Sequence, residues 1–479
     1  MNKSIIRYIL SRVLQFEGVF MLLPCIVALI YGEKHGLYFL ATAIVSFALG
    51  TLGGLIKPKS TVFYAREGFV TVSLSWILLS LVGAIPFVLT GEIPNYVDAL
   101  FETVSGFTTT GSTILRDVEY LSKTSQFWRC FIIWIGGMGV LVFIMAILPL
   151  SGSYNMHLMR AESTGADVGK LVPKVKNTAK LLYGMYISIS CILLILLMIA
   201  GLDLYNALLL MFSTVGTGGF CNVNASLGGF SHTVQVITIV FMILCGINFN
   251  AYFFLVMRKP KEILKMEEVR YYLGMLFVST AVITWCIRGS FGSLYEAFHN
   301  AIFHAASIVT TTGFALTDYE VWPMLPKAIL IMLTVVGACA GATAGGIKVS
   351  RFVILLKVLK RELEKLTHPR SVKKVRFNGQ TVSEDTVNSI IGFLIAYFFV
   401  LIISFLILSI NGFDFTTNIT AVLTTLSNVG PGLGGVGPAQ NFADYNMLSK
   451  SVLVIDMLAG RLEILPIFVL LYAGTWKRN

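Results

Sequence analysis

The sequence predicts an all-α integral membrane protein. It is expected to have four pseudo-repeats, each of a span, a short helix, a glycine-rich loop and a second span, preceded by an N-terminal helix pair. Of the 479 residues, 56% are hydrophobic and only 13% are charged, which is typical of chains that cross a bilayer several times. Long apolar runs recur near the length of about 20 residues that spans a bilayer. Four shorter apolar pieces end in almost the same glycine-rich run.

The apolar runs give the order of the elements. The first two runs form the N-terminal pair, and the others flank the short pieces in turn. The long runs lie at 13–31, 38–56, 69–90, 127–150, 181–201, 233–257, 271–287, 328–347, 387–411 and 451–474. The short pieces lie at 96–108, 204–215, 294–309 and 414–429. Because about 12 to 16 residues are too few to cross comfortably, we expect these pieces to be re-entrant helices.

This order divides the chain into five parts. An N-terminal transmembrane pair occupies 1–66, and the four repeats occupy 67–160, 161–265, 266–365 and 366–479. Pseudo-repeats in transporters commonly place the transport site at their shared interface, so we expect the site on the axis between the repeats.

Each short piece ends in a related motif. Packing one core does not require fourfold repetition, whereas four loops around an axis form a pore. Non-helical backbone is tolerated in a membrane where it lines a water-filled cavity, and carbonyl oxygens can replace the hydration shell of a potassium ion. The motifs therefore predict a cation pathway, with span, pore helix, filter loop and span repeated around a central pore. Aligned on Ser105, Ser213, Ser307 and Ser427, they read SGFTTTGS, STVGTGGF, SIVTTTGF and SNVGPGLG.

The distribution of positive charge predicts the orientation. With a cytoplasmic N-terminus, most of the 36 lysines and arginines fall on the inner side, as the positive-inside rule requires. Both termini are then cytoplasmic, and the net charge of +11 is explained without nucleic acid. The basic residues concentrate in segments 3–12, 57–66, 160–180, 258–270, 348–376 and 477–478.

The same orientation places the four loop mouths on the outer side, among acidic residues. We interpret most of these acids as solvated loop charges, and only their shared sign, which would concentrate cations, carries information. They are Glu92, Asp98, Glu102, Asp117, Glu119, Asp203, Glu296, Asp318, Glu320, Asp414 and Asp444.

The whole pattern resembles the Trk/Ktr/HKT superfamily of potassium transporters, and its bacterial TrkH branch in particular. The resemblance rests on the fourfold plan, the TTTG-type loops, the run GACAGATAGGIKVSR at 337–351 and the run AGRLEI at 459–464. It covers nearly the whole chain, including the N-terminal helix pair. It implies potassium uptake across the bacterial cell membrane by channel-like permeation.

The resemblance also implies a filter whose backbone carbonyls bind potassium, with no organic cofactor in this chain. Glycine allows the backbone conformations and the close approach that such loops need. In the last loop Leu433 stands where Gly111, Gly219 and Gly313 align, and we take Gly432 as their counterpart. The expected filter residues are Thr108, Thr109, Thr110, Gly111, Gly216, Thr217, Gly218, Gly219, Thr310, Thr311, Thr312, Gly313, Asn428, Val429, Gly430 and Gly432.

A gate is expected in the eighth long run. Gly and Ala dominate from 337 to 346, and helix propensity is low at the glycines. From the residues alone, a small-residue contact between helices would explain this run as well. The resemblance instead implies an unwound intramembrane loop that gates conduction. Its expected gate residues are Gly337, Ala340, Gly341, Ala342, Gly345, Gly346 and Lys348.

Arg461 lies inside the last span. A charge in a span is costly and is by default a functional hypothesis. Glu463 lies only two residues on and points elsewhere on the helix, so the structural alternative is a pair with an acidic residue of another span. The resemblance places Arg461 just inside the filter, as part of the gate, where it would be an electrostatic barrier that limits flux.

The expected partners follow from the resemblance. They are membrane lipid, a second copy in a homodimer, and cytosolic TrkA-like nucleotide-binding subunits, because this chain has no nucleotide-binding fold of its own. Potassium symport coupled to sodium or proton entry stays the alternative; a buried acidic residue lining the pore would favour it, and none is clear. No HExxH, GxSxG or paired aspartate motif appears, so we do not expect an enzyme.

Overall fold

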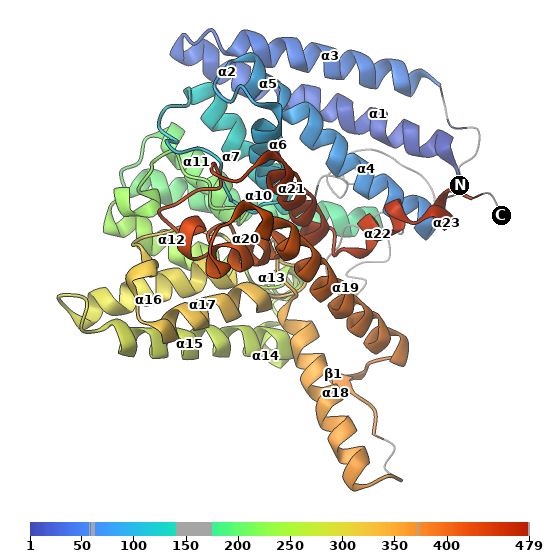
Figure 1. Cartoon of the computed structure of the whole chain (residues 1–479), viewed down its shortest axis with the longest axis vertical. Helices are drawn as coiled ribbons and strands as arrows, with labels where there is room; N and C mark the ends of the chain where they lie inside the picture. The colour runs from blue at the N-terminus through green and yellow to red at the C-terminus, as the bar shows by residue number, and fades with distance from the viewer. Residues whose placement is uncertain (57, 59–62, 140–174, 371–372, 478–479) are drawn as a thin grey trace.

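The structure is a computed structural model that describes residues 1–56, 58, 63–139, 175–370 and 373–477. In these residues the regular elements are helices, apart from one antiparallel hairpin (Figure 1). The hairpin pairs β1 (Arg376–Phe377) with β2 (Gln380–Thr381). The predicted helical architecture is therefore confirmed.

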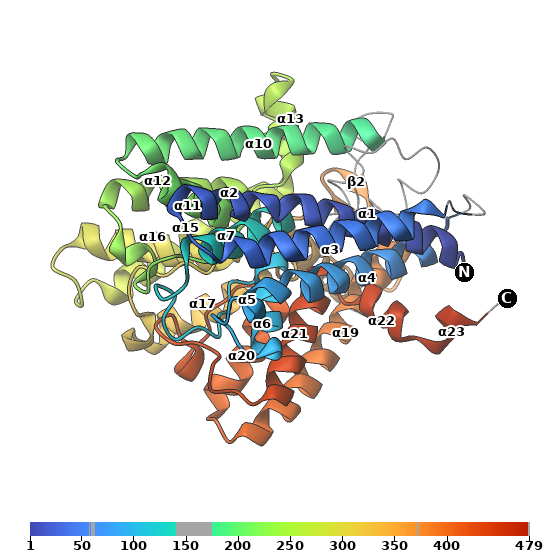
Figure 2. The same cartoon turned by 90° about the horizontal axis from the view of Figure 1, so that it is seen from above.

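The N-terminal pair consists of α1 (Lys3–Phe20), which continues into α2 (Leu22–Tyr31), and α3 (Gly36–Leu55). Helices α1 and α3 run side by side in both views (Figures 1 and 2). Small residues allow this close approach, since a Cβ added to Gly50 would lie 2.6 Å from the carbonyl oxygen of Ser11. Helix α1 begins before its apolar run because the Asn2 side chain accepts a hydrogen bond from the N–H of Ile5 at its start.

The four repeats follow the predicted order. The first contains α4 (Ala65–Gly83), α5 (Ile85–Leu89), α6 (Tyr96–Phe107) and α7 (Lys123–Gly137). The second contains α10 (Val175–Ile199), α11 (Leu204–Val215), η1 (Ser226–Gly229), α12 (His232–Cys245), α13 (Phe249–Val256) and α14 (Pro260–Lys265). The third contains α15 (Glu267–Ile287), α16 (Leu294–Val309), η2 (Tyr319–Val321), α17 (Met324–Val336) and α18 (Val349–Thr367). The fourth contains α19 (Glu384–Leu408), η3 (Ser409–Asn411), α20 (Phe415–Ser427), η4 (Gly434–Val436), α21 (Met447–Arg461), α22 (Leu465–Leu471) and α23 (Ala473–Trp476).

Six helical segments of the described residues are long and apolar enough to cross a bilayer. They match the N-terminal runs and the first span of every repeat. They lie at Lys3–Tyr31, Gly36–Leu55, Ala65–Leu89, Lys180–Ile199, Glu267–Ile287 and Glu384–Asn411.

The second span of each repeat is not a continuous helix. This corrects the predicted runs 127–150, 233–257 and 451–474, whereas the break in 328–347 agrees with the unwound loop expected at 337–346. The run 233–257 is bent by 93° between α12 and α13, the run 328–347 leaves the helix after Val336, and the run 451–474 is interrupted after Arg461. In the run 127–150, α7 ends at Gly137, and residues 140–150 lie outside the described part of the chain.

The short apolar pieces form the predicted short helices α6, α11, α16 and α20. Each helix begins at a side-chain cap, which satisfies N–H groups that the first turn leaves free. Most of their residues are buried, so the core of the molecule lies around these four helices. The caps are Asn95, Asp203, Ser293 and Asp414.

The predicted domain boundaries stay predictions. The boundary at 66/67 falls in the first turn of α4, and the one at 365/366 falls in the last turns of α18. The boundary at 160/161, together with the basic residues Arg160, Lys170 and Lys174, lies outside the described residues.

The start of α4 lies beside the end of the chain. Arg66 donates a hydrogen bond to the carbonyl oxygen of Lys477 at 3.0 Å, and the N–H of Asn2 donates to Glu67 at 3.1 Å. Figures 1 and 2 show the first turn of α1 and helix α23 at the same end of the molecule. The two chain ends therefore lie on one side of the helix assembly. Helix α18 extends from the assembly in a different direction (Figure 1).

Candidate functional site

The four short helices end in the same backbone turn. In each one, a backbone N–H just after the helix donates a hydrogen bond to the carbonyl oxygen of the residue five positions earlier, inside the helix. The donor and acceptor pairs are Thr110 to Ser105 (2.8 Å), Gly218 to Ser213 (3.0 Å), Thr312 to Ser307 (2.8 Å) and Val429 to Thr424 (2.9 Å). The turns are therefore equivalent although their sequences differ.

Two positions in each turn have a left-handed backbone. The first has φ near 55° in all four loops, at Thr109 (56°), Thr217 (55°), Thr311 (55°) and Asn428 (55°). The second comes two residues later and is always glycine, at Gly111 (80°), Gly219 (66°), Gly313 (81°) and Gly430 (99°). A β-branched residue at positive φ is an outlier, and such strain clusters at functional sites.

This geometry corrects the register of the fourth loop. Thr424, not Ser427, occupies the place of Ser105, so the alignment on Ser427 is wrong by three residues. Gly430 is the structural counterpart of Gly111, and Gly432 lies beyond the turn. A Cβ on Gly432 would lie 2.8 Å from Thr420 Oγ1, and its N–H donates to the carbonyl of Val436 at 2.7 Å, which bends the chain toward η4.

The four glycines close a ring. A Cβ on each glycine would collide with a backbone carbonyl oxygen of the neighbouring loop, so no other side chain fits without a shift. Each loop therefore packs against the next, and the fourth packs against the first. The contacts run from Gly111 to Gly218, from Gly219 to Thr312, from Gly313 to Val429 and from Gly430 to Thr110.

Several side chains of the loops form hydrogen bonds to one another. Thr108 and Thr110 share a hydrogen bond of 2.8 Å between their hydroxyl oxygens, and Thr310 and Thr312 repeat it at 2.8 Å. The Asn428 amide donates to Thr110 Oγ1 at 2.9 Å, so it joins the fourth loop to the first. These residues are all buried.

The segment from Gly337 to Lys348 runs between α17 and α18 without helical structure. It touches two of the loops, because the N–H of Gly345 donates to Thr311 Oγ1 at 2.6 Å and the N–H of Gly346 donates to the Ser427 carbonyl at 2.9 Å. The unwound loop expected here is thus present as a backbone feature. Left-handed backbone occurs at Gly337, Gly341, Gly346 and Lys348.

The unwound segment is also attached to the break between α12 and α13. The N–H of Cys339 donates to the Gly246 carbonyl, and the N–H of Phe249 donates to the Gly341 carbonyl, both at 3.1 Å. Within the segment, the N–H of Ala342 donates to the Cys339 carbonyl at 3.3 Å. Lys348 donates through Nζ to the carbonyl of Ala344.

Glu268 on α15 holds the same segment, and the sequence analysis missed it. Its carboxylate is buried and accepts hydrogen bonds from the N–H of Ala340 at 2.6 Å and the N–H of Ser350 at 3.2 Å. The sequence does not single out Glu268, because it follows Glu267 at the end of a span, where charged residues are common. Only the fold brings the carboxylate to the loop.

Arg461 ends α21 and contacts two other repeats. Its guanidinium donates to the carbonyl of Thr343 in the unwound segment at 2.8 Å. It also donates to the carbonyls of Gly136 and Gly137 at the end of α7, at 2.5 and 2.8 Å. Glu463 forms an ion pair with Arg351. Arg461 therefore bridges the first and third repeats from the fourth.

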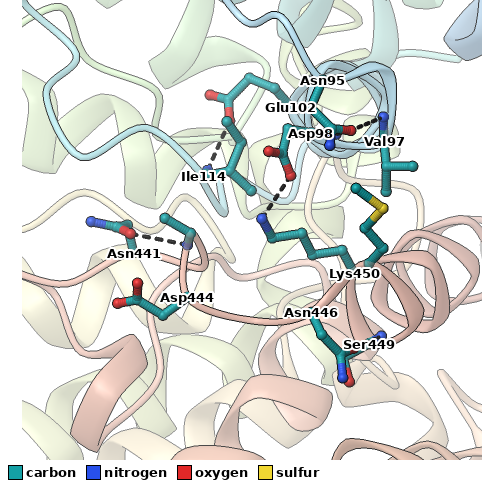
Figure 3. A network of polar contacts seen from close by, with 12 residues as sticks. Asn95, Val97, Asp98, Glu102, Ile114, Asn441, Asp444, Asn446, Ser449 and Lys450 are labelled. Carbon is teal, nitrogen blue, oxygen red and sulfur yellow. Dashed lines mark hydrogen bonds and ion pairs between the residues drawn. The ribbon is translucent and has the colours of Figure 1, made fainter. Parts of the chain in front are cut away.

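Many of the outer acids have local structural partners. Asp98 forms an ion pair with Lys450 at 2.7 Å, which joins α6 to α21 (Figure 3). Glu102 is buried against Arg129, and Asp203 and Asp414 are helix caps. These contacts support the interpretation that each of these acids, taken singly, has a local structural role.

Asp117, six residues beyond Gly111, is an exposed anion. Its carboxylate accepts hydrogen bonds from the Asn224 side chain at 2.8 Å and from the N–H of Glu119 at 2.9 Å. These bonds, the Asn224 one above all, hold the pKa of Asp117 below its ordinary value. Asp117 therefore stays charged at neutral pH.

A second buried acid, Asp456, was also missed. It lies on α21, is 1% exposed, and accepts a hydrogen bond from Ser404 of α19 at 2.8 Å. Five residues separate Asp456 from Arg461, which places the two side chains about 140° apart around the helix. Asp456 thus faces α19, the first span of its own repeat.

Comparisons with known proteins agree with this architecture. The sequence matches the family described as TrkH, cation transport protein, over residues 35–287 and 278–473. It is 36% identical over 488 residues to the Trk system potassium uptake protein TrkH of Vibrio parahaemolyticus, and 35% identical over 483 residues to that of Escherichia coli. Each alignment covers 99% of this chain and 99% of the relative.

The crystal structure of the potassium transporter TrkH from Vibrio parahaemolyticus superimposes with a TM-score of 0.89 at 34% sequence identity. The superposition covers 100% of both chains. It confirms the predicted fold class, four pseudo-repeats around a central pore preceded by an N-terminal helix pair. The chain therefore belongs to the TrkH family of cation transport proteins.

Proposed function

We propose that this protein takes up potassium across the bacterial cell membrane by channel-like permeation. The observation that carries the proposal is the closed ring of four equivalent loops, each with the same pair of left-handed residues. The relatives named as potassium uptake proteins align over nearly their whole length, which supports potassium as the cargo.

In this proposal the loop carbonyls take the place of the water around the ion. The hydroxyl groups of Thr108, Thr110, Thr310 and Thr312 bond to one another, which favours the backbone as the ligand. Gly430 replaces Gly432 as the filter glycine of the fourth loop. With that register all four loops carry glycine at the same position, and Leu433 lies three residues beyond it.

The gate we propose combines the unwound segment 337–348 with Arg461. The segment lies against the third and fourth loops, and Arg461 is bonded to it at Thr343. A fixed positive charge next to the loops would raise the energy of a cation that passes. Loosening the segment from Arg461 would open the path.

Symport with sodium or protons stays the alternative. Such a mechanism would need a buried carboxylate that lines the pore. Glu268 and Asp456 are both buried. Glu268, however, accepts hydrogen bonds from the N–H groups of Ala340 and Ser350, and Asp456 accepts one from Ser404 on α19, and these bonds do not lead to the loops. Channel-like permeation is therefore the better-supported reading.

We further propose a homodimer in the bacterial cell membrane with cytoplasmic termini and cytosolic TrkA-like subunits that bind the regulatory nucleotide. The basic segments near the chain ends and in 348–376 support this orientation. The relatives are named as parts of a Trk system, which supports a separate regulatory component.

Ion flux through the purified chain in liposomes tests the function. Potassium and sodium flux are compared for the wild type, Gly313→Ser and Arg461→Ala. We expect potassium-selective flux in the wild type, loss of selectivity in Gly313→Ser, and higher flux in Arg461→Ala. Gly392→Ser is the matched control, because a Cβ at that exposed glycine would meet nothing within 4 Å.

Absence of cation flux from the folded wild type would have one further test. TrkA-like subunits are then added with nucleotide, and flux that appears only with them makes them obligatory partners. No flux under either condition would contradict the assignment of the four loops to a filter.

A further inference from the structure

Two of the four loops are attached at their exits by the same hydrogen bond. In the corrected register, the third residue beyond the filter glycine donates its N–H to a side chain of the short helix. The pairs are Ile114 to Glu102 (3.0 Å) and Leu433 to Thr420 (3.0 Å). In the third loop, His304 of the short helix lies against the same segment, with Nε2 3.0 Å from the Thr317 carbonyl oxygen. Because the shared hydrogen bond fixes where the chain leaves the loop, it constrains the glycine three residues before.

Glu102 makes the most extensive of these attachments. Its carboxylate is 0% exposed, and besides Ile114 it accepts hydrogen bonds from Thr113 Oγ1 at 2.9 and 3.0 Å (Figure 3 shows Glu102 against Ile114). Arg129 Nε on α7 donates to it at 2.6 Å. Hydrogen bonds to an ionised group are about twice as strong as neutral ones.

Arg129 extends this attachment to the second loop. It is 2% exposed, its Nη1 donates to the carbonyl of Cys221 at 2.9 Å, and its guanidinium lies 3.7 Å from the ring centroid of Phe220. Phe220 and Cys221 directly follow the glycine of the second loop. One buried guanidinium therefore joins the exits of two neighbouring loops.

We propose that Glu102 and Arg129 are positioning residues that set the selectivity of the filter. They hold the outer ends of the first and second loops at a fixed spacing and act through Gly111 and Gly219. Neither side chain contacts the cargo in this account. The inference rests on the proposed function of the loops as a filter.

The pair is expected to control selectivity more than flux. Discrimination between cations depends on the number and arrangement of the coordinating carbonyls, and a loop whose exit is free can contract around a smaller ion. The proposed gate contacts other parts of the loops, at Thr311 and Ser427. Loss of the pair therefore leaves the gate in place while the ring relaxes.

The test compares potassium and sodium flux in liposomes for the wild type, Arg129→Lys, Glu102→Gln and the double variant. Lysine keeps the charge but cannot reproduce the guanidinium fork that reaches both Glu102 and Cys221. We expect the potassium-to-sodium flux ratio to fall about tenfold in each single variant, the effect of one charged hydrogen bond. The double variant falls no further than the stronger single, because both act through one contact.

Arg116→Gln is the matched control. Arg116 also pairs with a carboxylate, Asp444, at 2.5 Å, but the two side chains are 72% and 66% exposed. Its flux ratio is expected to stay at the wild-type value. A comparable fall in this variant would mean that any lost ion pair lowers the ratio, and would overturn the inference.

Two further results would overturn it: unchanged ratios in folded Arg129→Lys and Glu102→Gln, or additive falls in the double variant. If the charge variants do not fold, Thr113→Val replaces them, because it removes a hydroxyl donor to Glu102 and keeps both charges. A wild-type ratio in Thr113→Val then counts against the inference. Failure of the proposed function is distinguishable, since the wild type itself would pass no cation.

Discussion

At the scale of single residues, the loops accept strain that a merely structural turn would avoid. Thr109, Thr217 and Thr311 are β-branched and left-handed, a combination that costs of order 1–3 kcal/mol. Asn428 fills the same position in the fourth loop, and asparagine tolerates that backbone better. Its amide also donates to Thr110 Oγ1 and to the Met457 carbonyl, both at 2.9 Å. The fourth loop therefore has less backbone strain at this position than the other three, and its asparagine side chain forms two hydrogen bonds.

Gly430→Ala tests the corrected register. Alanine there would adopt φ near 99°, and its Cβ would lie 2.9 Å from the Thr110 carbonyl oxygen. We expect the potassium-to-sodium flux ratio in liposomes to fall about tenfold or more, since roughly 1.4 kcal/mol of distortion is enough. Gly412→Ala is the control, because Gly412 is also left-handed, with φ of 72°, but has open space around it.

The same flux ratios also show which result would support the alignment on Ser427. Gly430→Ala would then keep the wild-type ratio, while Gly432→Ala would lose it. The sequence could not decide between these registers, because Thr424 and Ser427 are both small hydroxyl residues near the end of one helix. The backbone geometry distinguishes them, through the hydrogen bond from Val429 to Thr424 and the positive φ of Asn428 and Gly430.

At the scale of elements, the residues alone predicted the short helices but not the breaks in the second spans. The one break that was expected, at 337–346, rested on the family resemblance. An apolar piece too short to span a bilayer has few alternatives to a re-entrant helix. A glycine run, in contrast, fits both close packing and unwinding. Gly246 and Gly337 illustrate this: the first marks a sharp bend, the second the start of an unwound segment.

Glu268→Gln tests the attachment of the unwound segment. One carboxylate oxygen, Oε1, accepts the N–H groups of both Ala340 and Ser350. Glutamine keeps an acceptor oxygen but loses the negative charge, so both hydrogen bonds weaken. We expect potassium flux in liposomes to rise about three- to tenfold, the effect of weakening one charged hydrogen bond, with the flux ratio unchanged.

Glu267→Gln is the matched control for this prediction. Glu267 is the preceding residue, but it pairs with Lys357 and accepts the N–H of Asn378 at 3.1 Å, away from the segment. Its flux is expected to stay at the wild-type level. Flux in Glu268→Gln that equals the control, or a fall in selectivity, would count against a gate held by Glu268.

At the scale of the whole molecule, hydrogen bonds of different kinds join neighbouring repeats through the segments that follow the four loops. The N–H of Leu227 donates to the Ala315 carbonyl at 3.0 Å, and the Tyr319 hydroxyl donates to the Gly432 carbonyl at 3.1 Å. The N–H of Phe442 donates to the Thr113 carbonyl at 2.8 Å, which joins the fourth repeat to the first. The sequence repeat predicts the four loops but not these hydrogen bonds. The residues that form them differ in type from one repeat to the next.

The proposed orientation gives the last prediction. One labelled site in the basic segment 348–376 and one in the segment that follows the fourth loop decide which side of the membrane each occupies. In a variant without the native cysteines, Gln440→Cys and Lys360→Cys are both exposed positions. In right-side-out vesicles, a membrane-impermeant thiol reagent should label Gln440→Cys before permeabilisation and Lys360→Cys only afterwards. The opposite pattern would place the basic segment 348–376 outside, against the positive-inside rule, and the filter mouths would then face the cytoplasm.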